Sequence, residues 1–120
     1  MTVLLSQTAF AVTATIPLLN QQNLNAQLFN AVIAGRVLQA SKLIKAGADV
    51  NARYNIYGSQ MTPLMKAAAY ENVPMIQLLL QNKADISDTG RSGRTALKWY
   101  IMNGGINPEI IKLLIPATTP

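Results

Sequence analysis

Thr-Pro-Leu-Met-Lys-Ala-Ala at Thr62–Ala68, followed by Leu-Leu-Leu-Gln-Asn-Lys-Ala-Asp-Ile at Leu78–Ile86, is the stretch of this 120-residue sequence that decides the fold. Its second part has a counterpart earlier in the chain. Lys-Ala-Gly-Ala-Asp-Val-Asn at Lys45–Asn51 returns as Gln-Asn-Lys-Ala-Asp-Ile-Ser at Gln81–Ser87, about 36 residues later. The sequence therefore contains an internal repeat, and a fixed period is the signature of stacked structural units.

The first part of the stretch also recurs, further along the chain. Met61–Ala68 is echoed by Arg94–Ile101, about 33 residues later. A third apolar run, Ile-Ile-Lys-Leu-Leu-Ile at Ile110–Ile115, closes the pattern. Three copies at nearly constant spacing predict a chain built from about three similar units.

Each unit is expected to fold as turn, helix, turn, helix. The hydroxyl of Thr62 can cap a first helix, and Pro63 stands at the first helical position, where its missing N–H costs nothing. Thr95 repeats the cap without the proline. Ala67 and Ala68 lie on one face of the short helix and let a neighbouring unit approach closely. No unit can bury its apolar stripe alone, so stacking is obligatory.

Residues that end helices recur in the same places. The inner turns of the three copies are expected at Gly35, at Asn72 and at the pair Gly104–Gly105. After the second helix, Gly47 suits a left-handed helix end, and Asp49 and Asp85 can hydrogen-bond the turn backbone. Lys83 replaces the glycine in the second copy, so that turn is predicted to be strained.

These residues together resemble the ankyrin repeat, whose pattern is T-P-L-H-x-A-A followed by L-L-x-x-G-A-D-V-N. Ala46–Asn51 matches the end of that pattern residue for residue, and the resemblance covers about Asn25–Ile115. It implies an all-α solenoid of about three helix–turn–helix repeats, near residues 25–52, 53–88 and 89–115. An apolar N-terminal arm or cap helix, residues 1–24, precedes the repeats, and a tail, residues 116–120, follows them.

The sequence departs from the ankyrin pattern at three places. Met65 replaces the usual histidine, and the first copy opens with Ala26–Phe29 instead of Thr-Pro. The third copy gains about two residues around Ile106–Pro108. These departures concern the details of the outer repeats and leave the architecture as expected.

The N-terminal segment Met1–Gln22 carries no charged side chain. Ala9-Phe10-Ala11 has the small-x-small form of a signal-peptidase site, but no basic residue precedes it. One interpretation is the remnant of a signal peptide, which would place the protein in a bacterial periplasm. The other is an apolar arm that covers the first repeat, which is compatible with the cytoplasm.

The composition argues against catalysis. The chain has no His and no Cys, which removes imidazole bases, thiol nucleophiles and the common zinc sites. Of the five acidic residues, two already have a turn role, and Gly90–Gly93 lacks the sequel of a phosphate-binding loop. We therefore expect no enzyme activity, no cofactor and no metal. No apolar run approaches the ~20 residues that cross a bilayer.

The candidate binding residues lie on loops and short helices. The loop Ala52–Met61 is about three residues longer than the period requires, and it corresponds to the projecting finger of ankyrin stacks. Tyrosines and arginines are typical of interface hot spots. The candidates for partner binding are Arg53, Tyr54, Ile56, Tyr57, Lys66, Tyr70, Arg91, Arg94, Lys98 and Trp99. Two alternatives stay open: a finger tyrosine folds back onto the stack, or Trp99 packs against the last helix.

The resemblance and the net charge of +5 together indicate the function. We expect a non-enzymatic protein-interaction module that binds a partner with an acidic patch through its finger loops and concave face. A small inhibitor or immunity-type protein is one concrete version. A structural unit that dimerises through the apolar last helix, Pro108–Ile115, is the main alternative. A basic nucleic-acid binder is less favoured.

Overall fold

The computed structural model describes residues 21–56 and 58–116. The Ala9–Ala11 sequence, most of the expected arm, Tyr57 and the tail 117–120 lie outside these residues. Within the described part, no helix is long and apolar enough to cross a membrane.

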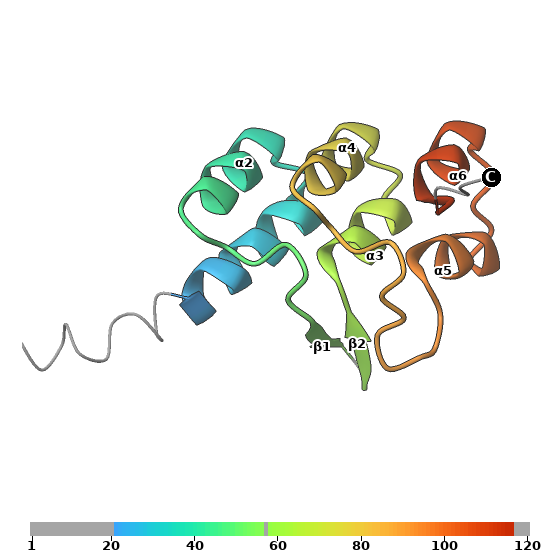
Figure 1. Cartoon of the computed structure of the whole chain (residues 1–120), viewed down its shortest axis with the longest axis horizontal. Helices are drawn as coiled ribbons and strands as arrows, with labels where there is room; N and C mark the ends of the chain where they lie inside the picture. Colours follow the sequence, from blue (N-terminus) through green and yellow to red (C-terminus); the bar gives the residue numbers. More distant parts are fainter. Residues whose placement is uncertain (1–20, 57, 117–120) are drawn as a thin grey trace, which may run out of the picture.

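The described chain is a stack of helical pairs with one hairpin. An inner layer holds the first helix (residues 21–34), α3 and α5, and an outer layer holds α2, α4 and α6 (Figure 1). The bounds are α2 Val37–Lys45, β1 Tyr54–Ile56, β2 Ser59–Met61, α3 Pro63–Ala69, α4 Val73–Gln81, α5 Ala96–Met102 and α6 Pro108–Leu114. β1 and β2 form the only sheet in residues 21–56 and 58–116, so the expected all-α repeat stack with a finger hairpin is confirmed there.

The helices begin where the sequence provides caps. The Thr62 and Thr95 hydroxyls accept hydrogen bonds from the backbone N–H groups of Met65 and Lys98, at 3.2 and 3.3 Å. Asn72 caps α4 in the same way, through Met75 N–H at 3.2 Å. Each cap satisfies an N–H group that has no partner inside the helix.

The inner turn of the second repeat lies at Asn72, as expected. Its left-handed position is Glu71, with φ +54°, and Asn72 caps the next helix. Gly35 and Gly104 fill the same position in the other repeats, with φ of +73° and +86°. Lys83 has φ +68° where Gly47 has +112°, which confirms the strained turn.

The core consists of residues at matching repeat positions. Leu43, Leu79 and Leu114 stand at one place in α2, α4 and α6, and their exposed fractions are 6%, 0% and 1%. α3 packs beside α5, and α4 packs between α2 and α6. The middle repeat is therefore buried from both sides.

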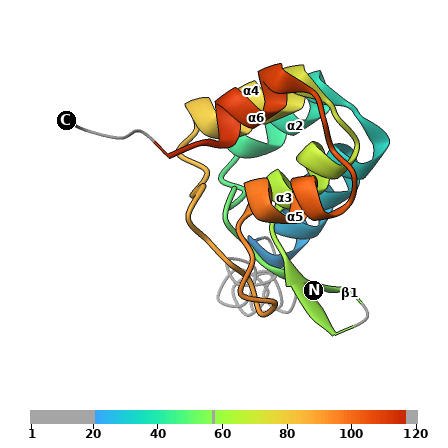
Figure 2. The ribbon, with the colours of Figure 1, turned by 90° about the vertical axis from the view of Figure 1, so that its right-hand side faces the viewer.

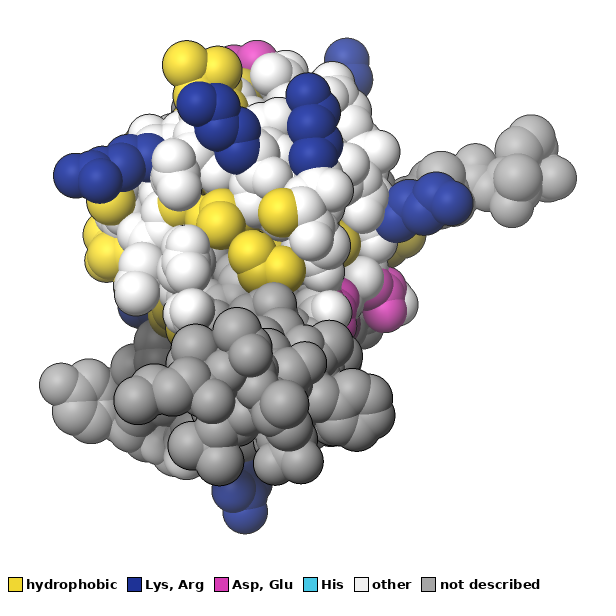
Figure 3. Space-filling view, turned by 90° about the vertical axis from the view of Figure 1, so that its left-hand side faces the viewer, with side chains coloured by type: hydrophobic (Ala, Val, Ile, Leu, Met, Phe, Trp, Pro, Cys, Tyr) yellow, Lys and Arg dark blue, Asp and Glu magenta, His cyan; other side chains and the backbone are white. Residues whose placement is uncertain are grey.

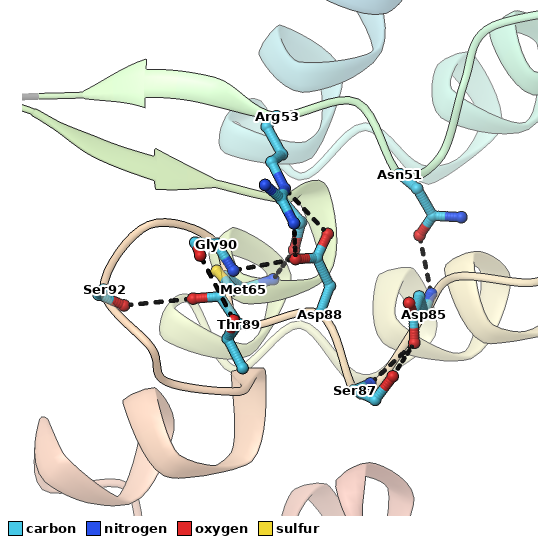
Figure 4. Close-up of polar contacts among 10 residues, drawn as sticks. Asn51, Arg53, Met65, Asp85, Ser87, Asp88, Thr89, Gly90 and Ser92 are labelled. Carbon is cyan, nitrogen blue, oxygen red and sulfur yellow. Dashed lines mark hydrogen bonds and ion pairs between the residues drawn. The ribbon is translucent and has the colours of Figure 1, made fainter.

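A ladder of polar side chains links the turns of adjacent repeats. Asn51 Oδ1 accepts from the N–H of Asp85 at 2.7 Å (Figure 4). Asn51 Nδ2 donates to the Lys83 carbonyl at 3.2 Å. Asp49 Oδ1 accepts from Asn51 N–H, and Asp85 Oδ1 accepts from Ser87 N–H, both at 2.9 Å. The expected turn roles of Asp49 and Asp85 are confirmed.

Candidate functional site

The finger hairpin is anchored to the stack by a tyrosine. β1 and β2 are antiparallel, and the ring of Tyr54 stacks on Phe29 of the first helix with centroids 4.1 Å apart. The Tyr54 hydroxyl is buried without a hydrogen-bond partner in the described structure. Burial, with a smaller effect of the Asp49 charge, raises the pKa of Tyr54 to about 12. Tyr54 therefore folds back onto the stack, which is one of the alternatives that the sequence left open. It does not project from the finger as an exposed binding residue.

Arg53 is also used internally. Its guanidinium donates to both carboxylate oxygens of Asp88, at 2.6 and 3.3 Å (Figure 4). The Asp88 side chain is only 9% exposed, and the Arg53 hydrogen bond lowers the pKa of that carboxyl. This bidentate ion pair connects the base of the hairpin to the loop of the next repeat. Arg53 thus has a structural contact, while its side chain remains 49% exposed and its partner-binding role stays a prediction.

The loop that contains Arg91 is pressed against the hairpin at one glycine. Gly90 donates its N–H to Asp88 Oδ1 at 2.9 Å and has φ +56°. A Cβ on Gly90 would lie 2.1 Å from the Gln60 carbonyl oxygen, so no side chain fits there. Arg91, which follows it, is exposed beside the hairpin.

Ile56 ends β1 in the hairpin, and the other described candidates lie on or next to the inner helices α3 and α5. Lys66 lies over the Tyr70 ring at 5.8 Å on α3, and Arg94 lies over the Trp99 ring at 5.9 Å next to α5. Lys98 is exposed on α5. We call these five residues the inner strip.

The inner strip is positively charged and rich in aromatic surface. Among residues 21–56 and 58–116, the one ion pair within 4.0 Å joins Arg53 to Asp88, so the strip's cations have no carboxylate partner there. Tyr70 is 54% exposed and Trp99 is half-buried. Cations braced on aromatic rings suit an acidic macromolecular surface.

A hollow of about 420 Å³ opens at the end of the strip, between the C-terminal ends of α3 and α5. Its lining residues are Ala69, Glu71, Trp99, Tyr100, Asn103, Gly104 and Gly105. Glu71 accepts a hydrogen bond from the Tyr100 hydroxyl, and burial and this bond raise the pKa of Tyr100. Glu71 and Tyr100 were not among the sequence candidates. The signal for Glu71 is a glutamate where the neighbouring repeats have glycine.

No described group has the arrangement of a metal site: residues 21–56 and 58–116 hold no cluster of three His, Cys, Asp or Glu side chains. The strip provides fixed charge and aromatic surface, and the hollow provides a shaped cavity.

Residues 18–119 match the family model of ankyrin repeats in three copies. The chain belongs to the ankyrin-repeat family. Ankyrin repeats generally mediate protein–protein interaction, and ankyrin-repeat proteins are typically non-enzymatic interaction modules.

Two curated ankyrin proteins are similar to this ankyrin chain. The ankyrin repeat and KH domain-containing protein mask-1 of Caenorhabditis elegans is 34% identical over 102 residues, covering 84% of this chain and 4% of that protein. The ankyrin repeat and SAM domain-containing protein 6 of Rattus norvegicus is 26% identical over 87 residues, covering 72% of this chain and 10% of that protein. The chain thus spans a small part of the length of both relatives.

Proposed function

We propose that this ankyrin chain binds a protein partner with an acidic surface through the inner strip, Arg91 and the finger loop with Ile56 and Tyr57. The observation that carries the proposal is the pair of cations stacked on aromatic rings, Lys66 in α3 and Arg94 next to α5, with no described carboxylate within ion-pair distance. A ring under a cation holds the side chain in one place, which lowers the entropy lost on binding.

The proposed consequence of binding is regulation of the partner. A partner held on this side has its acidic surface covered, so an enzyme whose active site lies there is inhibited by occlusion. This is the immunity-type role that the sequence suggested, in the cytoplasm or, if Ala9–Ala11 is a processing site, in a periplasm.

The experiment uses the single tryptophan of the chain as its reporter. Because Trp99 lies in the strip, titration with an acetylated decaglutamate peptide should change its fluorescence saturably, and added salt should weaken the binding. Arg94→Ala with Lys98→Ala should abolish binding. Lys42→Ala with Lys112→Ala removes the same charge from exposed positions of α2 and α6 and should leave binding intact.

Two results would contradict the proposal. Equal losses from both double variants would show attraction by net charge alone. Tighter binding of single-stranded oligonucleotides than of the acidic peptide, lost in Arg94→Ala with Lys98→Ala, would assign the strip to nucleic acid instead.

A second candidate function, self-association, is favoured by the C-terminal end of the stack, which faces the viewer in Figure 2. Its exposed apolar side chains, with their exposed fractions, are Ile101 (50%), Met102 (54%), Ile106 (83%) and Ile115 (49%).

The first repeat also exposes apolar side chains, Ile33 at 41% and Leu38 at 80%, but it differs at one matching position. At the position where Met75 and Ile110 are buried against the preceding repeat, the first repeat has the exposed polar residue Gln39. Figure 3 shows this end with separate apolar patches among polar atoms and with Lys and Arg on its upper rim. We propose that a second copy of the chain packs against the exposed apolar side chains at the C-terminal end of the stack.

Sedimentation velocity of the whole chain tests this second candidate. A dimer that dissociates in Ile101→Glu with Ile115→Glu is the expected result. A wild-type monomer at about 100 μM, far above the Kd of a stable dimer, would contradict it.

A further inference from the structure

We propose that the hollow beside the strip takes a basic side chain, lysine or arginine, of the bound partner. The inference rests on the proposed function, because it names a second feature of the same partner: a cationic residue adjoining its acidic segment. The inference rests on the Glu71 carboxylate, on the hydrogen bonds that hold it and its donor in place, and on the residues that line the hollow around it.

The carboxylate of Glu71 is held by one hydrogen bond, and the donor of that bond is itself held in place. The Tyr100 hydroxyl donates to it, and the same hydroxyl accepts from the Asn107 backbone N–H at 3.1 Å. The tyrosine ring in turn lies against Gly105, where a Cβ would come within 2.4 Å of it. A buried tyrosine, a backbone amide and a glycine therefore fix the position of one exposed carboxylate.

The backbone of Glu71 is strained for the same arrangement. The residue closes α3 at φ +54°, a conformation that glycine adopts freely and that other L-residues rarely adopt. Gly35 and Gly104 show that the repeat accepts glycine there. Strain of this kind gathers at binding sites, where the side chain has a use that outweighs its cost.

The Glu71 carboxylate has no cationic partner in residues 21–56 and 58–116. Lys66, Arg94 and Lys98 belong to the neighbouring strip, yet none lies within 4.0 Å of it. Trp99 is one of the residues that line the hollow, whose volume of about 420 Å³ is ample for one side chain. In such a hollow, the aliphatic stem of a lysine or arginine packs against the tryptophan while its cation pairs with the carboxylate.

An acidic side chain does not fit this description, because Glu71 repels it. The strip and the hollow therefore have opposite preferences a short distance apart. A partner segment that suits both sites carries acidic residues over the strip and one basic residue at the hollow. This arrangement fixes the position of the segment along the stack and also adds affinity.

The test is an NMR titration of the isotope-labelled whole chain with N-acetyl-L-arginine methylamide. Saturable shifts are expected at the Gly104 and Gly105 amides and at the Trp99 indole N–H. The citrulline analogue has nearly the same shape without the charge and should bind at least about tenfold more weakly. The lysine analogue shows whether an ammonium group serves as well as a guanidinium.

Glu71→Gln provides the matched variant, because its amide oxygen still accepts from Tyr100. It should weaken arginine-analogue binding about tenfold while leaving decaglutamate binding unchanged. Equal shifts with the arginine and citrulline analogues in the unaltered chain would overturn the inference without any variant. If the unaltered chain bound the arginine analogue but not decaglutamate, only the proposal of an acidic partner would be overturned.

Discussion

One backbone position recurs at the ends of successive helices, and its occupants decide part of the stability. The first helix, α2, α3, α4 and α5 all close with the same two backbone hydrogen bonds around a left-handed residue. Three of these residues are glycines, and the other two are Glu71 and Lys83. The Glu71 side chain has a contact that accounts for its presence. The Lys83 side chain makes no such contact in the described structure.

Lys83→Gly should therefore stabilise the chain by about 1 kcal/mol, because glycine removes the left-handed strain without removing a contact. The free energy of unfolding is measured by urea denaturation followed by circular dichroism. Gly47→Ala is the reverse control: its added Cβ meets no atom within 4 Å, so only the φ of +112° opposes it. It should destabilise by about 1 kcal/mol, and an unchanged midpoint in both variants would refute the strain.

Tyr54 controls part of the behaviour at alkaline pH. Its pKa of about 12 in the folded chain lies above the ordinary value of 10, so the folded state holds a proton that the unfolded state has lost between these pH values. The contribution of Tyr54 to the free energy of unfolding should be constant below about pH 10 and fall as pH rises above it. The raised pKa of Tyr100 adds to the fall.

Tyr54→Phe should reduce this alkaline loss and raise stability at neutral pH by about 1 kcal/mol, since the buried hydroxyl has no partner. Urea denaturation at several pH values between about 8 and 11.5 tests both effects. An unchanged alkaline slope together with lower stability at neutral pH would show that the hydroxyl has a partner in solution.

At the scale of elements, polar contacts between turns hold the repeats in register. Asn51→Ala removes an acceptor for Asp85 N–H and a donor to the Lys83 carbonyl, so it should cost about 1–2 kcal/mol. Gln77→Ala, at an exposed position of α4, is the control and should change stability by less than about 0.5 kcal/mol. If the two substitutions changed stability equally, hydrogen bonds to water would replace those of Asn51 without a loss of stability.

The elements also show what the sequence could and could not predict. Helix starts at Thr62 and Thr95 were predictable because a cap acts on residues three positions away. The pairing of Arg53 with Asp88 joins residues 35 positions apart, and that of Glu71 with Tyr100 joins residues 29 apart. Such contacts depend on how one repeat lies on the next, so the residue pattern left Arg53 as a free cation and did not identify the hollow.

At the scale of the whole molecule, stability comes from the interfaces between repeats. A repeat stack is approximately a sum of weak units and strong neighbour contacts, so damage to the middle unit affects both interfaces. The side chain of Leu79 is fully buried in α4, which packs between α2 and α6. This leucine is therefore the most sensitive test of the stacking.

Leu79→Asp should unfold the entire chain. It removes a buried leucine and buries an unpaired carboxylate, and the combined cost of about 4 kcal/mol or more approaches the full stability of a small domain. Circular dichroism should show loss of helix at 25 °C, and size exclusion should show an expanded chain. Gln77→Asp places the same charge two residues away on the exposed face of α4 and should leave the melting temperature within a few degrees of the unaltered chain. A Leu79→Asp chain that kept its helical signal and melted cooperatively would mean that the three repeats do not stack through this position.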